Sequence, residues 1–189
     1  MQYISLAKCI LTLSRLRGDS VKVLVGPETP PSFWHLPKAL LSHHSAFFKK
    51  TCEIKSFMYL PIDDASVFEY FVEFLYHSTY TLSSAPETSG RQHAAAWVLG
   101  EKYQAISFQN CAMRNIYYLH EGIFANELIP SEVQFVFQNS SSGSLLREFY
   151  LDMLGTHFTG PNRSKTSSQE WDRVMQDHAE VRVRILSLL

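Results

Sequence analysis

The segment from Phe57 to Ile116 constrains the fold of this chain most strongly. It opens with four apolar residues, 57–60, which are typical of a short buried strand. Pro61 and an Asp-Asp pair end this strand, and after a helix and a polar loop two further helices are expected at 93–104 and 107–120. The segment therefore predicts a strand followed by a group of helices, with few residues suited to chemistry.

The helix directly after the Asp-Asp pair, Val67 to Tyr76, is apolar on more than one side. Its apolar positions are Phe68, Tyr70, Phe71, Val72, Phe74, Leu75 and Tyr76. Such a pattern is typical of a helix buried between two layers. We expect Asp63 or Asp64 to be its N-cap, because a carboxylate there accepts hydrogen bonds from the first free N–H groups of a helix.

The residues before this segment predict a hairpin and two short helices. A β-branched apolar run at 21–26 is followed by a Pro-rich turn, and residues 32–35 form the return strand. Two helices follow, at 38–42 and, capped by Ser45, at 46–52. Since strands come first and helices second, the pattern favours an α+β domain over alternating βαβ units.

The C-terminal third is predicted to be helical. A capping box at Ser131 and Gln134 opens a short helix, and another is expected at 144–157. A linker of small and polar residues at 160–168 precedes a last helix at 169–189. This helix has a seam at three- and four-residue spacing, made of Trp171, Val174, His178, Val181, Ile185 and Leu188. Because the seam covers fewer than three heptads, we expect it to pack on the preceding helices and not to form a coiled coil.

The composition is that of a globular chain with few charges. Charged residues make up 19% of the 189 residues, and the formal net charge is -1. The basic residues are scattered, which argues against a nucleic-acid surface, because phosphate binding needs clustered Lys and Arg. No segment approaches the ~20 apolar residues of a membrane span. Three dispersed cysteines, Cys9, Cys52 and Cys111, indicate reduced thiols and a location in the cytoplasm or nucleus.

No group of residues predicts a catalytic, cofactor or metal site. His43 and His44 are adjacent, so on a helix their side chains point about 100° apart and do not ligate one metal on a common face. Helix capping explains Asp63 and Asp64 better than acid–base chemistry does, because a carboxylate at an N-terminus also favours the helix dipole. The chain also has no glycine-rich phosphate loop and no G-x-S-x-G elbow. We therefore expect no enzyme activity, with a small metal-dependent enzyme as the last alternative.

The order of these elements and the residues at their joints resemble the BTB/POZ fold, in particular the fungal BTB family. The similarity covers residues 18–120 and is carried by the stretches 21–26, 33–48, 60–76, 99–103 and 109–110. In the second stretch Lys38, Leu41, Ser45, Phe47 and Phe48 match the family pattern in order. Two positions depart from it, because Ser20 stands where the family has Asp and Pro37 stands where it has His.

This resemblance implies a small three-stranded sheet capped by helical hairpins, with an all-helical C-terminal extension. The implied division is an N-terminal helix or unstructured leader at 1–17, the BTB/POZ-like domain at 18–120, a helical extension at 121–160, and a linker with the C-terminal helix at 161–189. For residues 1–17 the apolar spacing favours a docking helix, while a targeting peptide and a misassigned start codon remain the alternatives.

The resemblance also implies a protein-interaction module without catalytic chemistry. Family members often dimerise through a helix before the first strand, which here would present Leu6, Ile10, Leu13 and Leu16. We expect the partner to be a second copy or another BTB protein, and the partner-facing residues to be Trp34, Phe47, Phe48 and Tyr76. The alternative is a substrate adaptor of a cullin-3 ubiquitin ligase, although the family's hydrophobic-x-Glu contact is not evident in the segment 51–55.

Overall fold

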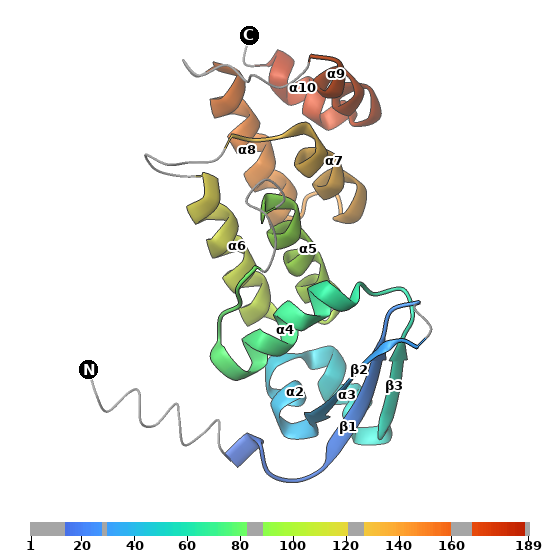
Figure 1. Ribbon diagram of the computed structural model, residues 1–189. Helices are drawn as coiled ribbons and strands as arrows, with labels where there is room; N and C mark the ends of the chain where they lie inside the picture. The colour runs from blue at the N-terminus through green and yellow to red at the C-terminus, as the bar shows by residue number, and fades with distance from the viewer. Residues whose placement is uncertain (1–13, 28–29, 83–88, 121–126, 160–167, 188–189) are drawn as a thin grey trace, which may run out of the picture. The chain divides into compact units, whose positions relative to one another are not determined.

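The chain folds into a small sheet and a larger set of helices, drawn in Figure 1 from a computed structural model that describes residues 14–27, 30–82, 89–120, 127–159 and 168–187. The strands are β1 (Ser20–Val25), β2 (Ser32–Pro37) and β3 (Phe57–Leu60). The helices are α2 (Lys38–His44), α3 (Ala46–Ile54), α4 (Ala65–His77), α5 (Ser89–Lys102), α6 (Ile106–His120), α7 (Pro130–Asn139), α8 (Leu145–Thr159), α9 (Ser168–Asp177) and α10 (Ala179–Leu186). The predicted α+β class and the three-stranded sheet are confirmed.

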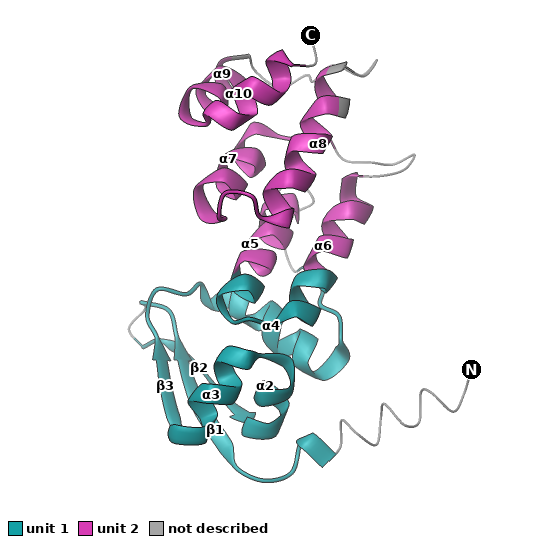
Figure 2. Cartoon of the chain, turned by 180° about the vertical axis from the view of Figure 1, so that it is seen from behind, with its two compact units in different colours: residues 1–82, 99–111 teal, residues 83–98, 112–189 magenta. Residues whose placement is uncertain are grey.

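Two compact units make up the chain, and Figure 2 colours them separately. Unit 1 consists of residues 1–82 and 99–111, and unit 2 consists of residues 83–98 and 112–189. The division lies inside α5 and α6, because each of these helices contributes residues to both units. It therefore differs from the sequence-based boundary at residue 120.

The sheet of unit 1 has the strand order β2-β1-β3. The central strand β1 pairs antiparallel with β2 and parallel with β3. A parallel pair needs a long crossover connection, which α2 and α3 supply here. Val21, Val23 and Val25 are fully buried, while the residues between them are not. This alternation gives the sheet one face on the core and one open face.

Ser45 forms the corner between α2 and α3. Its hydroxyl oxygen accepts a hydrogen bond from the backbone N–H of Phe48 at 3.0 Å, so it is the predicted N-cap of α3. The same hydroxyl donates to the backbone carbonyl of Tyr103 at 2.5 Å. One buried side chain therefore both caps α3 and ties this corner to the residue that follows α5.

The N-cap of α4 is Asp64. One of its carboxylate oxygens accepts hydrogen bonds from the N–H groups of Ser66 at 2.8 Å and Val67 at 3.4 Å. The helix ends at Ser78, whose φ of 58° is in the left-handed region that stops a helix. Its buried residues include Phe68, Tyr70, Phe71, Phe74 and Leu75, which confirms the predicted apolar helix.

The beginning of α7 differs from the sequence-based expectation. The N-cap is Ile129, which makes no side-chain capping hydrogen bond, and Pro130 occupies the first turn. The predicted capping box of Ser131 and Gln134 is therefore wrong. Proline in the first turn explains the helix start without it, because proline has no N–H that needs a partner.

The predicted single helix at 169–189 is also wrong, because the chain breaks at His178 between α9 and α10. His178 has extended backbone angles, and its ring centroid lies 5.6 Å from that of Phe137. The predicted packing on preceding helices is confirmed, since α9 contacts α7 and α10 contacts α8. Arg147 of α8 anchors α10 through an ion pair with Glu180 at 2.5 Å.

The two N-caps of unit 1 predict unequal losses of stability. Asp64→Ala removes an exposed cap and should lower the free energy of unfolding by about 1 kcal/mol. Ser45→Ala removes a cap and also a buried hydrogen bond to the Tyr103 carbonyl, so the loss should be about 2 kcal/mol. Urea unfolding of the two variants checks the order, and equal losses would show that the Ser45–Tyr103 bond contributes nothing.

Candidate functional site

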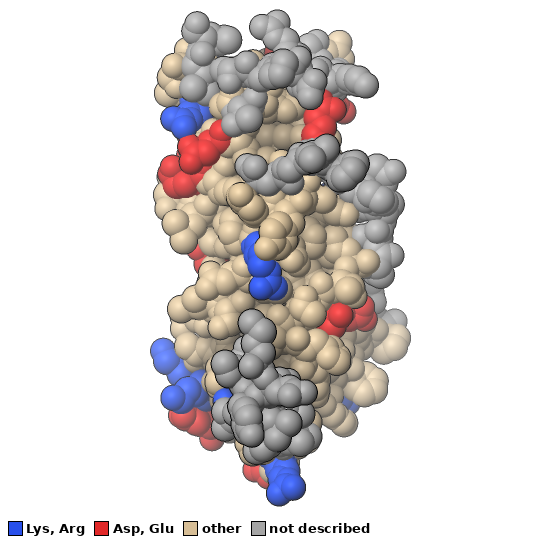
Figure 3. Space-filling model, turned by 90° about the vertical axis from the view of Figure 1, so that its left-hand side faces the viewer, with Lys and Arg blue, Asp and Glu red and all other residues tan. Residues whose placement is uncertain are grey.

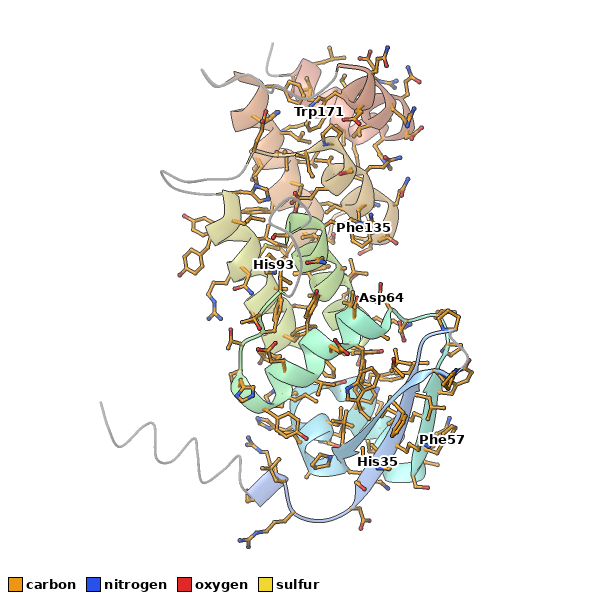
Figure 4. The ribbon with its side chains drawn as sticks, in the orientation of Figure 1. His35, Phe57, Asp64, His93, Phe135 and Trp171 are labelled. Atoms are coloured by element: carbon orange, nitrogen blue, oxygen red, sulfur yellow. The ribbon has the colours of Figure 1, made fainter. Side chains whose placement is uncertain are left out.

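The open face of the sheet carries large exposed apolar side chains. We call it the outer sheet face, and it consists of Lys22, Leu24, Phe33, His35, Phe57 and Tyr59. The exposed fractions are 62% for Phe33, 51% for Phe57 and 50% for Tyr59. His35 and Phe57 are labelled on the sheet in Figure 4. Exposed aromatic residues on the two edge strands, with Leu24 of the central strand between Phe33 and Tyr59, make an apolar surface across the sheet.

Strand register arranges the outer sheet face in two rows. In one row, Leu24 of β1 lies opposite Phe33 of β2 and Tyr59 of β3. In the other, Lys22 lies opposite His35 and Phe57. Because residues two positions apart in a strand lie on one face, the rows are about 7 Å apart. The first row is apolar, and the second combines a base, an imidazole and an aromatic ring.

Lys22 lies across this face. Its Nζ is 4.9 Å from the ring centroid of Phe33, a distance typical of a cation–π contact. The outer sheet face contains no Asp or Glu. Lys22 also takes part in none of the ion pairs found among the described residues. Among the described residues, the face therefore presents a positive charge that no carboxylate pairs with.

A buried polar cluster in unit 1 is centred on Asp63. The Nζ of Lys102 lies 2.5 Å from one carboxylate oxygen, and the hydroxyl of Tyr103 donates to the other at 3.0 Å. Burial and the neighbouring Asp63 carboxylate raise the pKa of Tyr103 well above its usual range. Asp63 was predicted as a possible helix cap, but the structure gives that role to Asp64 alone and makes Asp63 a tertiary acceptor.

A second buried cluster, in unit 2, is centred on Glu132. The Nε2 of His120 lies 2.8 Å from the Glu132 carboxylate, and the hydroxyl of Tyr150 donates to the same oxygen. A Cβ at position 90 would collide with this carboxylate, so a larger side chain there would displace Glu132 from its position in the cluster. Burial and the Glu132 carboxylate raise the pKa of Tyr150.

His93 lies in the same unit and is labelled in Figure 4. Burial, with a smaller contribution from the charge of His120, lowers the pKa of His93 from 6.5 to about 4. In unit 1, burial likewise lowers the pKa of His44 to about 4, with His43 and Arg15 adding to the shift. Both histidines are therefore neutral in the folded protein near pH 7.

Neither cluster has the arrangement of a reactive site. Glu, His and Tyr are groups used in acid–base catalysis, but Glu132, His120 and Tyr150 are buried and bonded to one another. Their geometry matches that of a satisfied buried network, in which each polar group has a partner. Within the described ranges, no three His, Cys, Asp or Glu residues come together in a way that could hold a metal ion.

The predicted dimer interface lies mostly outside the described residues. This applies to Leu6, Ile10 and Leu13, whereas Leu16 is described and is 38% exposed. The assignment of these four leucine and isoleucine residues to an interface therefore stays a prediction.

The four predicted partner-facing residues have different environments. Tyr76 is 39% exposed, and Phe47 is half-buried with its ring stacked on Tyr103. Trp34 is also half-buried and lies against Phe68, with ring centroids 4.9 Å apart. Phe48 is fully buried, so its assignment as a partner-facing residue was wrong. Its place at the third position of α3 turns it toward the core aromatic residues Phe71 and Tyr103.

Sequence reasoning missed Phe33, Phe57 and Tyr59. The signal that could have found them is alternation, because Phe57 and Tyr59 flank Met58, which is 5% exposed. In β2, however, Phe33 and Trp34 are adjacent and of similar size, so the pattern does not show which of the two faces the core.

Charged side chains do not gather into a basic surface on the face drawn in Figure 3. There, Lys and Arg lie in small separate groups, several of them next to Asp or Glu. Among the helices that the structure describes, none has the length and hydropathy needed to cross a bilayer.

The lowered pKa values predict a loss of stability in acid. Below pH 6.5 the unfolded chain binds protons at His93 and His44, while the folded chain takes them up only near pH 4, so the free energy of unfolding falls over this interval. For the buried His93 the contribution is on the order of 2 kcal/mol.

Urea unfolding at about pH 8 and about pH 4.5 measures this loss. His93→Gln should reduce the difference in stability between the two pH values, each variant being compared with itself at the higher pH. The double variant with His44→Gln should reduce it further. A difference as large in His93→Gln as in the wild type would contradict the assigned cause.

The described residues thus offer an exposed aromatic surface, the outer sheet face, and two polar clusters whose carboxylates are buried. The surface can bind a partner, and the clusters can fix the positions of helices. In comparisons with known proteins, no family model and no curated protein matches this chain.

Proposed function

We propose that this chain is a protein-interaction module of the BTB/POZ type, without catalytic chemistry. One observation carries the proposal, namely the topology of unit 1. The hairpin of β1 and β2 leads into the helical pair α2 and α3, and β3 then returns parallel to β1. This order agrees with the small sheet and capping helical hairpins that the resemblance implies.

The residues at the joints support the same proposal. Ser45 lies at the turn between α2 and α3, and Asp64 opens α4 after β3, as the matched stretches lead one to expect. Tyr103 follows α5 and is fully buried against the aromatic residues of α3 and α4. The positions that carry the resemblance are therefore those that hold unit 1 together.

An interaction role fits the distribution of polar and apolar groups. The carboxylates of Asp63 and Glu132 are buried and bonded to neighbouring side chains. The large aromatic side chains of the outer sheet face are instead exposed. A reactive site needs accessible polar groups, whereas a binding surface needs accessible apolar ones.

The proposed assembly is a homodimer or a pair with another BTB protein. Leu6, Ile10, Leu13 and Leu16 recur at helical spacing, and a helix with this stripe would bury it against a second copy. A stable dimer of this kind buries ~1,200–2,000 Å² in total. We place the protein in the cytoplasm or nucleus.

Light scattering of the full chain at about 20 µM tests the assembly, and we expect the mass of a dimer. The double variant Ile10→Glu, Leu13→Glu should be a monomer, because it places two charges in the apolar stripe. Lys8→Glu is the matched control, since position 8 is about 200° around a helix from Leu6, and it should remain a dimer.

A monomeric wild type at this concentration would contradict the self-association. A dimer that persists in the double variant would instead contradict the assignment of the interface to residues 6–16. Circular dichroism of each variant confirms that the fold of unit 1 is retained.

A further inference from the structure

We infer that the outer sheet face binds an extended acidic segment of a different protein, in which an apolar residue and a Glu or Asp stand two positions apart. The inference rests on the proposed interaction function and names the surface and the chemistry of the partner. It follows from the exposure, the register and the charge of the six residues that form this face.

The exposed apolar side chains of the face are grouped together and are not scattered singly. Phe33, Phe57 and Tyr59 are each at least half exposed, and they lie on the two strands that flank β1, with Leu24 of β1 between Phe33 and Tyr59. Single exposed apolar residues are common on proteins, but contiguous aromatic side chains mark a contact surface. Aromatic residues are also enriched in the centres of interfaces.

The positive charge on the face favours a partner segment with negative charge. The amino group of Lys22 lies over the Phe33 ring and has no carboxylate partner among the described residues. His35 is in the same row and adds a second nitrogen base. A carboxylate placed beside Lys22 would form an ion pair next to an apolar surface, where screening by water is reduced.

A second copy of this chain does not complement the face. Two such faces would bring the Lys22 ammonium groups of both copies into one interface to which the face contributes no carboxylate, and like charges in an interface are unfavourable. The area is also small, since three half-exposed aromatic rings offer about 100 Å² each, against the ~800 Å² per partner of a stable interface. Both arguments favour a short segment of another protein.

The two rows give the spacing within this segment. An apolar side chain between Phe33 and Tyr59 would contact Leu24, and a carboxylate in the other row would reach Lys22. The rows are about 7 Å apart, which is the distance between alternate residues of an extended chain. An extended segment with an apolar residue and an acidic residue two positions apart, in either order, therefore fits both rows at once.

Fluorescence anisotropy with the full chain tests the inference. The probe is a labelled peptide that repeats Phe-Ser-Glu-Ser, so that Phe and Glu alternate on one side, and the matched probe carries Lys in place of Glu. At about 50 mM salt the acidic peptide should bind at least about tenfold more tightly than the basic one. Raising the salt should reduce this preference.

Variants of the chain locate the site. Phe33→Ser with Tyr59→Ser should weaken binding of the acidic peptide by about tenfold or more. Lys22→Glu should reverse the preference, so that the basic peptide binds more tightly. Lys50→Glu makes the same charge change on α3, away from the outer sheet face, and should leave the preference unchanged. The fold should be retained in every variant, because all of the substituted positions are exposed, namely Lys22, Phe33, Lys50 and Tyr59.

Three results would overturn the inference: no binding of the acidic peptide up to about 1 mM, equal binding of the two peptides, or binding that Lys22→Glu does not alter. It would also be overturned if Phe33→Ser with Tyr59→Ser converted a dimer into a monomer, because a second copy would then cover the face. A dimer that persists while the peptides fail to bind would refute this inference alone and leave the proposed self-association standing.

Discussion

Tyr103 is the residue on which the packing of unit 1 depends. Its ring is fully buried and contacts the rings of Phe47, Phe48, Phe68 and Phe71. Its hydroxyl donates to Asp63, and its backbone carbonyl accepts from the hydroxyl of Ser45. One residue therefore joins the α2–α3 corner, the start of α4 and the end of α5. Because each of its polar atoms has a partner, the ring can be buried without leaving an unsatisfied group. The sheet is held on this core by its buried valines, which leaves its other face open.

The sequence predicted those parts of this arrangement that depend on near neighbours. Ser45 and Asp64 bond to N–H groups two or three residues away, so their roles as caps follow from local pattern alone. Asp63 and Glu132 have partners that lie farther along the chain, at Tyr103 and Tyr150, and no local pattern indicates such contacts. The break at His178 also depends on residues far away in the sequence. The apolar spacing continues through His178, and only tertiary contacts such as that with Phe137 distinguish two helices from one.

The exposed residues of the open sheet face could not be predicted for a different reason. In β2 both faces carry an aromatic residue, because Phe33 points outward and Trp34 lies against Phe68. Hydrophobic alternation assigns strands to a core only where one face is polar. The sequence-based set of partner-facing residues therefore includes Trp34 and does not include Phe33, Phe57 or Tyr59. A strand with apolar residues on both faces is expected when one face packs on the core and the other on a partner. The aromatic residues on both faces of β2 make its orientation hard to predict from the sequence, and they also support a binding surface on the open face.

Both units contain the same kind of polar cluster, but the two clusters differ in their exposure to solvent. In each, a carboxylate is held by a tyrosine hydroxyl and a nitrogen base, with Asp63 bonded to Tyr103 and Lys102, and Glu132 bonded to Tyr150 and His120. The side chain of Lys102 is 41% exposed, so water shares in stabilising its charge. That of His120 is only 1% exposed, and loss of either partner would leave a group of the Glu132 cluster buried without compensation. Removing a partner should therefore be more costly in unit 2 than in unit 1. Gly90 lies directly against the Glu132 carboxylate, so a larger side chain at position 90 would displace that carboxylate from its partners. The buried network of unit 2 consequently fixes the spacing of its helices, while unit 1 retains the exposed aromatic surface that a partner can reach.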